Sequence, residues 1–172
     1  VENLSTQTMP TLGTAIATYC GQNLGAGKYD RIYEGMKKGF FICIFISLVA
    51  SAICVFGGRF IVSWFVSNPS EEIFDYAMQY LNTISLFMLP LAWIFLYRNA
   101  LQGLNRGFIP MLSGAVEMVC RIIVIALTLK PYGYWAVRLA SPLTWLVTGI
   151  LLIVTYFIWE KKQRSLSTSS DR

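Results

Sequence analysis

The sequence combines three glycines with a lysine in residues 21–31, GQNLGAGKYDR, a composition that raises the possibility of phosphate binding. A phosphate-binding loop requires G-x-x-x-x-G-K-[ST], because its backbone N–H groups wrap the phosphates while a hydroxyl holds Mg²⁺. Here Gly21 and Gly27 are one residue too far apart, and Tyr29 stands where the motif requires Ser or Thr. The dinucleotide fingerprint G-x-G-x-x-G is also missing. The stretch therefore does not predict a nucleotide site.

Glu117 and Arg121 form the second candidate functional site, because these two ionisable residues are four positions apart in a long apolar segment. Residues with this spacing lie on one helical face. An ionisable side chain inside a membrane is costly and is a functional hypothesis by default, so Glu117 is a candidate proton or cation relay. The alternative is a structural ion pair that joins this helix to a neighbour, through Arg98 or Asn99. Because a permanently charged arginine tends to keep its partner carboxylate ionised, we prefer the structural pair to the relay.

Further polar and aromatic residues lie in the segment that precedes Glu117. Arg98, Asn99 and Gln102 crowd one end of it, and Asn82 lies near the other. We expect Arg98 to extend towards the membrane surface, with a gating contact as the alternative. Asn82 could face a cavity or form a hydrogen bond between helices. The aromatic residues of the same segment could stack on a flat organic cation, although packing or lipid contact is the preferred role: Phe87, Trp93, Phe95 and Tyr97.

The composition places these residues in a lipid bilayer. Hydrophobic residues make up 55% of the 172 and charged residues 13%, whereas soluble domains carry about 25% charged residues. With no histidine in the chain, hydrolytic triads and typical zinc sites lose their commonest member, so we expect neither an enzyme nor a metal or organic cofactor. The net charge of +5 is explained by basic loops, and no nucleic-acid partner is expected.

Long apolar segments, each near the roughly 20 residues that cross a bilayer as a helix, predict an all-α integral membrane bundle. Pro90 lies within one of them and predicts a kink. We expect residues 160–172 to be a disordered tail, because they are charged and rich in serine. The expected spans are 4–20, which looks incomplete at its start, 39–66, 76–103, 108–129 and 135–159.

Basic residues predict the orientation of these spans. Ten of them fall on one side: Lys28, Arg31, Lys37, Lys38, Arg98, Arg106, Lys161, Lys162, Arg164 and Arg172. Arg59, Lys130 and Arg138 fall on the other. Because basic loops stay in the cytoplasm, we expect the glycine stretch and the C-terminus to be cytoplasmic and the protein to lie in the plasma membrane. The glycine stretch then becomes a tight turn between two spans.

Three motifs in order resemble the multidrug and toxic compound extrusion (MATE) transporters. They are GTAIATYCGQNLGAGKYDR at 13–31, RNALQGLNRGFIPMLSGAVEMVCR at 98–121 and GYWAVRLASPLTW at 133–145. The resemblance covers nearly the whole chain, and residues 1–159 look like part of the second six-helix lobe of a twelve-helix transporter. It implies a missing N-terminal lobe of the same protein as a partner, and alternating access to a central cavity.

The resemblance also implies a function and roles for residues. Such proteins are antiporters for multidrug efflux, exporting cationic or amphipathic organic compounds in exchange for H⁺ or Na⁺. The loop motif of the family maps onto Gly21, Gln22, Asn23, Gly25, Ala26 and Gly27, where close helix packing at a moving hinge is implied. Some branches carry an acid in the kinked span; this chain has none between Tyr76 and Gly103, which leaves Glu117 as the coupling candidate, beside Arg121. The alternatives are a flippase for lipid-linked sugars and a stand-alone four-helix scaffold or subunit.

Overall fold

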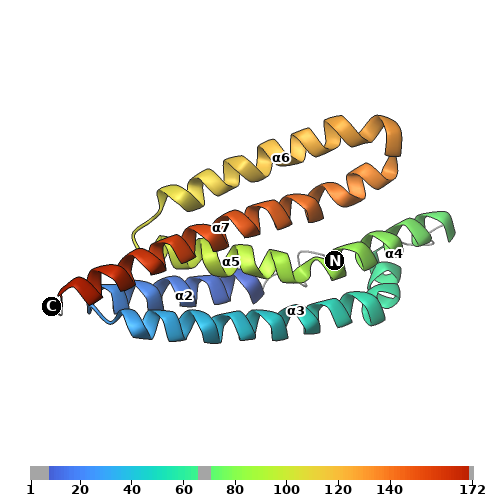
Figure 1. Cartoon of the computed structure of the whole chain (residues 1–172). Coiled ribbons are helices and arrows are strands. Elements are labelled where there is room, and N and C mark those ends of the chain that lie inside the picture. Colours follow the sequence, from blue (N-terminus) through green and yellow to red (C-terminus); the bar gives the residue numbers. More distant parts are fainter. Residues whose placement is uncertain (1–7, 66–70, 171–172) are drawn as a thin grey trace.

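The structure, a computed structural model, describes residues 8–65 and 71–170 (Figure 1). Every element in these residues is a helix, which confirms the expected all-α class. Within them, three helices are long and apolar enough to cross a membrane, or four if one bent pair counts as a single span. The helices are α2 Thr8–Gly25, α3 Tyr29–Phe65, α4 Glu71–Leu86, α5 Met88–Gly103, α6 Phe108–Tyr132 and α7 Tyr134–Ser170.

Helix α5 is the centre of the bundle. It packs against α2, α3 and α7, and its side chains supply much of the buried core, including Met88, Leu96 and Leu101. Helix α6 lies outside this group, where it packs mainly on α7 and only slightly on α5 (Figure 1). Most apolar side chains of α6 are consequently exposed on the surface of the bundle. This is the surface expected of a helix that contacts lipid or another part of a membrane protein.

The predicted kink at Pro90 is present, and it falls one turn before the proline. Helices α4 and α5 meet at Phe87 with a bend of 50°. Pro90 has no N–H to donate to the carbonyl of Leu86, four residues earlier, and its ring clashes with that carbonyl. The series of helical hydrogen bonds is therefore interrupted at the Leu86 carbonyl, and the two helices separate between Leu86 and Met88.

Helix α3 supplies hydrogen-bond donors to the backbone around this bend. Ser51 Oγ donates to the carbonyl of Ser85 at 2.6 Å, and Ser47 Oγ donates to that of Met88 at 3.3 Å. The two serines are one helical turn apart on α3, so they form a short polar stripe that faces the break. Carbonyls at a helix break in an apolar interior need such partners, because no water is available there.

The helices cover the described residues of each expected span, and several extend beyond it. Residues 4–7 and 66 of those spans lie outside the described part of the chain. Helix α3 runs on continuously through Gly57 and Gly58. Helix α7 continues to Ser170, so residues 160–170 are helical where a disordered tail was expected. The Glu160–Arg164 ion pair, at 2.8 Å, and the position of Arg164 over the Tyr33 ring stabilise this extension.

Three features expected on one side of the membrane lie at the same end of the bundle. Figure 1 shows the α2–α3 turn, the α5–α6 turn and the end of α7 together at the left. The end of α3, the start of α4 and the α6–α7 turn lie at the opposite end. The basic residues of the two turns, such as Lys28 and Arg106, are therefore gathered at one end.

Candidate functional site

Glu117 of α6 lies between two arginines. Its Oε1 accepts a hydrogen bond from Arg121 Nη2 at 3.0 Å, and its Oε2 accepts one from Arg98 Nη2 at 3.3 Å. Arg121 is one helical turn further along α6, as the sequence spacing predicts, whereas Arg98 comes from α5. Of the two partners considered for a bridge between helices, the structure places Arg98, and not Asn99, on the carboxylate.

This cluster, Arg98–Glu117–Arg121, is partly covered. The side chains of Glu117 and Arg98 are 22% and 26% exposed, and that of Arg121 is 42% exposed. The Nε atoms of both arginines are buried without a hydrogen-bond partner. A cavity of about 290 Å³ adjoins the cluster on the outer face of α6 and is lined by Glu117, Arg121 and apolar side chains. One carboxylate between two guanidinium groups leaves a net positive charge beside this cavity.

The other polar candidates do not join the cluster. The Asn99 amide donates to the carbonyl of Phe95 at 2.8 Å and lies where a side chain on Gly13 would have to be. Gln102 is exposed near the end of α5, and Asn82 is exposed on α4, across the bend from Arg98. The candidate set is therefore spread along both halves of the bent span.

The glycine stretch forms the turn between α2 and α3. Gly27 has a φ of 68°, a left-handed conformation that other residues rarely adopt. The N–H of Lys28 donates to the carbonyl of Asn23 at 2.9 Å, and that of Gly27 donates to Leu24 at 3.0 Å. This bonding pattern is a Schellman motif, which pairs carbonyls at the end of a helix. The backbone of the stretch thus ends α2.

The turn between α5 and α6 repeats this pattern. Asn105 has a φ of 57° and takes the place of Gly27. The N–H of Arg106 donates to the carbonyl of Leu101 at 2.9 Å, and that of Asn105 donates to Gln102 at 3.1 Å. Two turns at the same end of the bundle therefore have the same hydrogen bonds.

Small residues let α2 and α5 come into backbone contact. Gly13, Ala17 and Gly21 are spaced four apart along α2, the pattern by which membrane helices approach closely. A Cβ on Gly103 of α5 would collide with the Ala17 backbone, and one on Gly21 would be 3.3 Å from the Gly103 carbonyl oxygen. Gly25 and Gly27 have no such neighbours. Of the three glycines in the stretch, only Gly21 packs closely on the neighbouring helix.

Of the aromatic candidates, Trp93 and Tyr97 have defined ring partners. Trp93 stacks on Phe40 of α3 with ring centroids 5.7 Å apart, and Tyr97 packs on Tyr156 of α7 at 5.4 Å. In residues 8–65 and 71–170, no three His, Cys, Asp or Glu side chains come close enough to hold a metal ion.

Comparison with known proteins decides the family. The family model described as MatE matches residues 2–127, which is most of the chain. The chain belongs to the MatE family. No curated protein and no solved structure matches it. The match includes the glycine stretch, the bent span and the Arg98–Glu117–Arg121 cluster, so these features of the MatE chain lie within the part that defines the family. MatE proteins are membrane transporters as a class.

Sequence reasoning missed two features of this MatE chain. One is the serine stripe of α3, whose Ser47 and Ser51 meet the bend. Its signal was the four-residue spacing of polar residues in an apolar helix. The other is the contact between the start of α3 and the end of α7, where Arg164 lies 4.0 Å from the Tyr33 ring centroid. Nothing local in the sequence indicates that contact.

Proposed function

We propose that the complete protein containing this chain is a secondary-active antiporter. It exports cationic or amphipathic organic compounds in exchange for H⁺ or Na⁺, and an N-terminal six-helix lobe completes its substrate cavity. The observation that carries the proposal is the MatE family match over residues 2–127. The helices long enough to span a membrane agree with it.

We propose that the protein lies in the plasma membrane with the glycine turn and the C-terminus on the cytoplasmic side. Support comes from the charge of the turns, since Lys28, Arg31 and Arg106 lie at the end of the bundle where α7 also finishes (Figure 1). Positively charged loops are retained on the cytoplasmic side during insertion. Cysteine labelling at Arg106 and at Lys130 with a membrane-impermeant reagent tests this orientation, with labelling from outside expected at residue 130 alone.

For Glu117, the proposed role is to hold α6 against α5. Both carboxylate oxygens already face a guanidinium group, Arg98 from one helix and Arg121 from its own. Since α6 otherwise touches α5 only slightly, the Arg98–Glu117 pair is a polar link between them. An ion-coupling carboxylate would need to release such partners before it could bind H⁺ or Na⁺.

Transport is tested with the complete protein reconstituted in liposomes. We expect ethidium to accumulate against its gradient when either a proton or a sodium gradient is imposed, and accumulation to stop when that gradient is collapsed. Equal ethidium movement in protein-free liposomes, or no response to either gradient, would contradict the antiporter.

The role of Glu117 is tested separately with Glu117→Gln in the same assay. A positioning role predicts that export persists, at a reduced rate, with the same dependence on the imposed gradient. Loss of gradient dependence, with the protein still folded, would instead make Glu117 the coupling residue. Glu34→Gln is the matched control, because the side chain of Glu34 is 64% exposed and pairs with Lys38.

A further inference from the structure

Arg121 lies near the middle of the span formed by α6. The span runs over Phe108–Pro131, which places Arg121 about 20 Å along the helix from its start and about 15 Å from its end. Long basic side chains near the ends of a span can reach the membrane surface, but one at the centre cannot. Charged groups at that depth face the protein interior or a water-filled cavity, because lipid contact is costly. The side of α6 that carries Arg121 therefore does not face lipid.

The residues beside Arg121 line one open side of α6. A Cβ at Gly114 would meet nothing within 4 Å, and Met118 and Ile122 are each 60% exposed. Residues that recur every three or four positions share one side of a helix. We call this set the Arg121 face, and its members line the cavity of about 290 Å³: Gly114, Glu117, Met118, Arg121, Ile122 and Ile125.

The Arg98–Glu117–Arg121 cluster leaves one positive charge unbalanced in the described part of the chain. Both oxygens of Glu117 are occupied, one by Arg121 at 3.0 Å and the other by Arg98 at 3.3 Å. Helices α5 and α6 hold no other acidic residue, and α7, on which α6 packs, has none before Glu160. Of the two arginines, Arg121 lines the cavity. Its Nη2 is bound to Glu117 and its Nε is buried, which leaves Nη1 to face the cavity.

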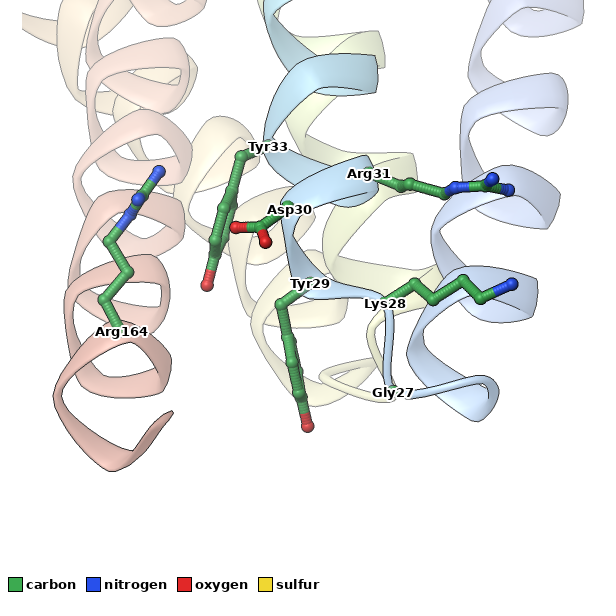
Figure 2. A pocket seen from close by; sticks show the side chains of 7 residues that line it. All are labelled: Gly27, Lys28, Tyr29, Asp30, Arg31, Tyr33 and Arg164. Carbon is green, nitrogen blue, oxygen red and sulfur yellow. The ribbon is translucent and has the colours of Figure 1, made fainter. Parts of the chain in front are cut away.

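Two larger cavities of the bundle differ from this one in their charge. The first, between α3, α5 and α7, has a volume of about 740 Å³ and is lined by Trp93 and Tyr156, and its Arg164 is 2.8 Å from Glu160. The second, of about 690 Å³, lies beside the α2–α3 turn, where Figure 2 shows Asp30 on the side of α3 that faces Arg164. The basic residues of the second cavity lie at the end of the bundle, where water and salt screen them. The charge of Arg121 has neither a carboxylate of its own nor a place at the surface.

We propose that the Arg121 face binds the anionic group of an amphipathic organic compound, in a water-filled space of the complete protein. A carboxylate or sulfonate accepts a charge-assisted hydrogen bond from Arg121 Nη1. The apolar body of the compound lies against Met118 and Ile122. A cation is repelled here, so the cationic compounds of the proposed function bind elsewhere. The inference rests on the proposed transport function and adds a ligand class for this face.

The first test measures the sign of the electrostatic potential at the Arg121 face. Met118→Cys, in the complete protein without native cysteines, is treated with an anionic methanethiosulfonate (ethylsulfonate) or a cationic one (ethyltrimethylammonium). Relative to their rates with a free thiol, we expect the anionic reagent to react faster. Arg121→Gln should lower the ratio of the two rates about threefold to tenfold, because the probes have opposite charge.

Two variants control for the loss of the arginine. Arg121→Lys keeps the positive charge and should keep the ratio of the two rates. Lys130→Gln is the matched control, because it removes a positive charge from an exposed position near the end of the same helix. It should also leave the ratio unchanged. An equal fall of the ratio in Lys130→Gln and Arg121→Gln would contradict a local effect of Arg121.

The second test adds a ligand. Naphthalene-2-sulfonate should slow the labelling of the Met118→Cys thiol in a saturable manner, whereas 2-naphthyl-trimethylammonium, which has the same ring and a positive charge, should not. The protection should be lost in Arg121→Gln. Equal protection by the two compounds, or protection that persists in Arg121→Gln, would overturn the proposal.

An unreactive Met118→Cys thiol would also overturn it. That result would mean that lipid or a part of the protein outside this chain covers the Arg121 face, with a carboxylate of that part as the partner of Arg121. Labelling needs no ion gradient, so its outcome is separate from that of the transport assay. Ethidium export without protection by the sulfonate would leave the antiporter standing and remove the anion site alone.

Discussion

Gly103 of α5 packs directly on the backbone of Ala17 in α2, with no space for a side chain between them. Because a methyl group there meets backbone and not a movable side chain, Gly103→Ala must push the two helices apart. We expect it to reduce the free energy of unfolding by about 1–3 kcal/mol. Thermal unfolding of the detergent-solubilised complete protein measures this loss.

Gly114→Ala is the control for that substitution, because a Cβ at Gly114 in α6 has no neighbour within 4 Å. Alanine favours a helix over glycine by up to about 1 kcal/mol, so this variant should be neutral or more stable. An equal loss of stability in both variants would mean that the α2–α5 contact is not the cause.

The Arg98–Glu117 pair should behave as a coupled pair in a double-mutant cycle. We expect Glu117→Gln and Arg98→Gln each to lower the free energy of unfolding by about 1 kcal/mol, with a coupling energy of about 0.6–1 kcal/mol. The exposed Glu34–Lys38 pair, 2.7 Å apart on α3, serves as the comparison and should couple more weakly, because solvent screens both charges. A coupling energy near zero for Arg98 and Glu117 would show that this pair does not hold α6 against α5.

Pro90→Ala should straighten the α4–α5 span, because an alanine N–H can donate to the Leu86 carbonyl. Spin labels at Glu72 and Arg106, in a background without native cysteines, report the end-to-end distance. We expect this distance to lengthen in the variant and export to slow. Pro131→Ala, at an exposed position in the last turn of α6, should change neither. An unchanged Glu72–Arg106 distance in Pro90→Ala would show that α3 alone maintains the bend.

The α2–α3 turn should tolerate asparagine better than valine at Gly27. A left-handed conformation costs an ordinary residue roughly 1–2 kcal/mol, and a β-branched side chain adds to this. Asparagine occupies the equivalent place in the α5–α6 turn, where Asn105 has a φ of 57°. Unfolding temperatures should therefore fall in the order glycine, asparagine, valine. Equal temperatures for Gly27→Asn and Gly27→Val would contradict a backbone cause, since the surroundings of Gly27 are open.

Apolar segment length and local spacing were sufficient to predict much of this fold. Pro90 predicted the bend, and the spacing of Glu117 and Arg121 predicted their contact. The helical end of α7 was not predicted. The spacing of Glu160 and Arg164 was a local signal for it, whereas the contact of Arg164 with Tyr33 joins distant parts of the chain. The apolar pattern stops before that point, and the polar composition alone resembles a tail.

The candidate site was less accessible to sequence reasoning than the fold. Spans that are apolar nearly all round do not reveal which face meets which neighbour. Two arrangements depend on helix rotation. One is the choice of Arg98 over Asn99 as the partner of Glu117. The other is the grouping of Trp93 with Tyr156 at one groove. Periodicity does not fix that rotation, so both arrangements had to come from the folded structure.

The serine stripe of α3 keeps one carbonyl at the bend of the α4–α5 span hydrogen-bonded in either shape of the span. In a straight helix the amide of Leu89 would donate to the carbonyl of Ser85, which now accepts from Ser51 at 2.6 Å. Straightening would replace the Ser51 hydroxyl with the Leu89 amide as the donor, so the Ser85 carbonyl would keep a hydrogen bond in an interior without water. The hydrogen bonding of the Ser85 carbonyl therefore does not oppose straightening, and the energy difference between the bent and straight forms is set by Pro90 and by packing. A span of this kind can change shape while the membrane around it stays dry.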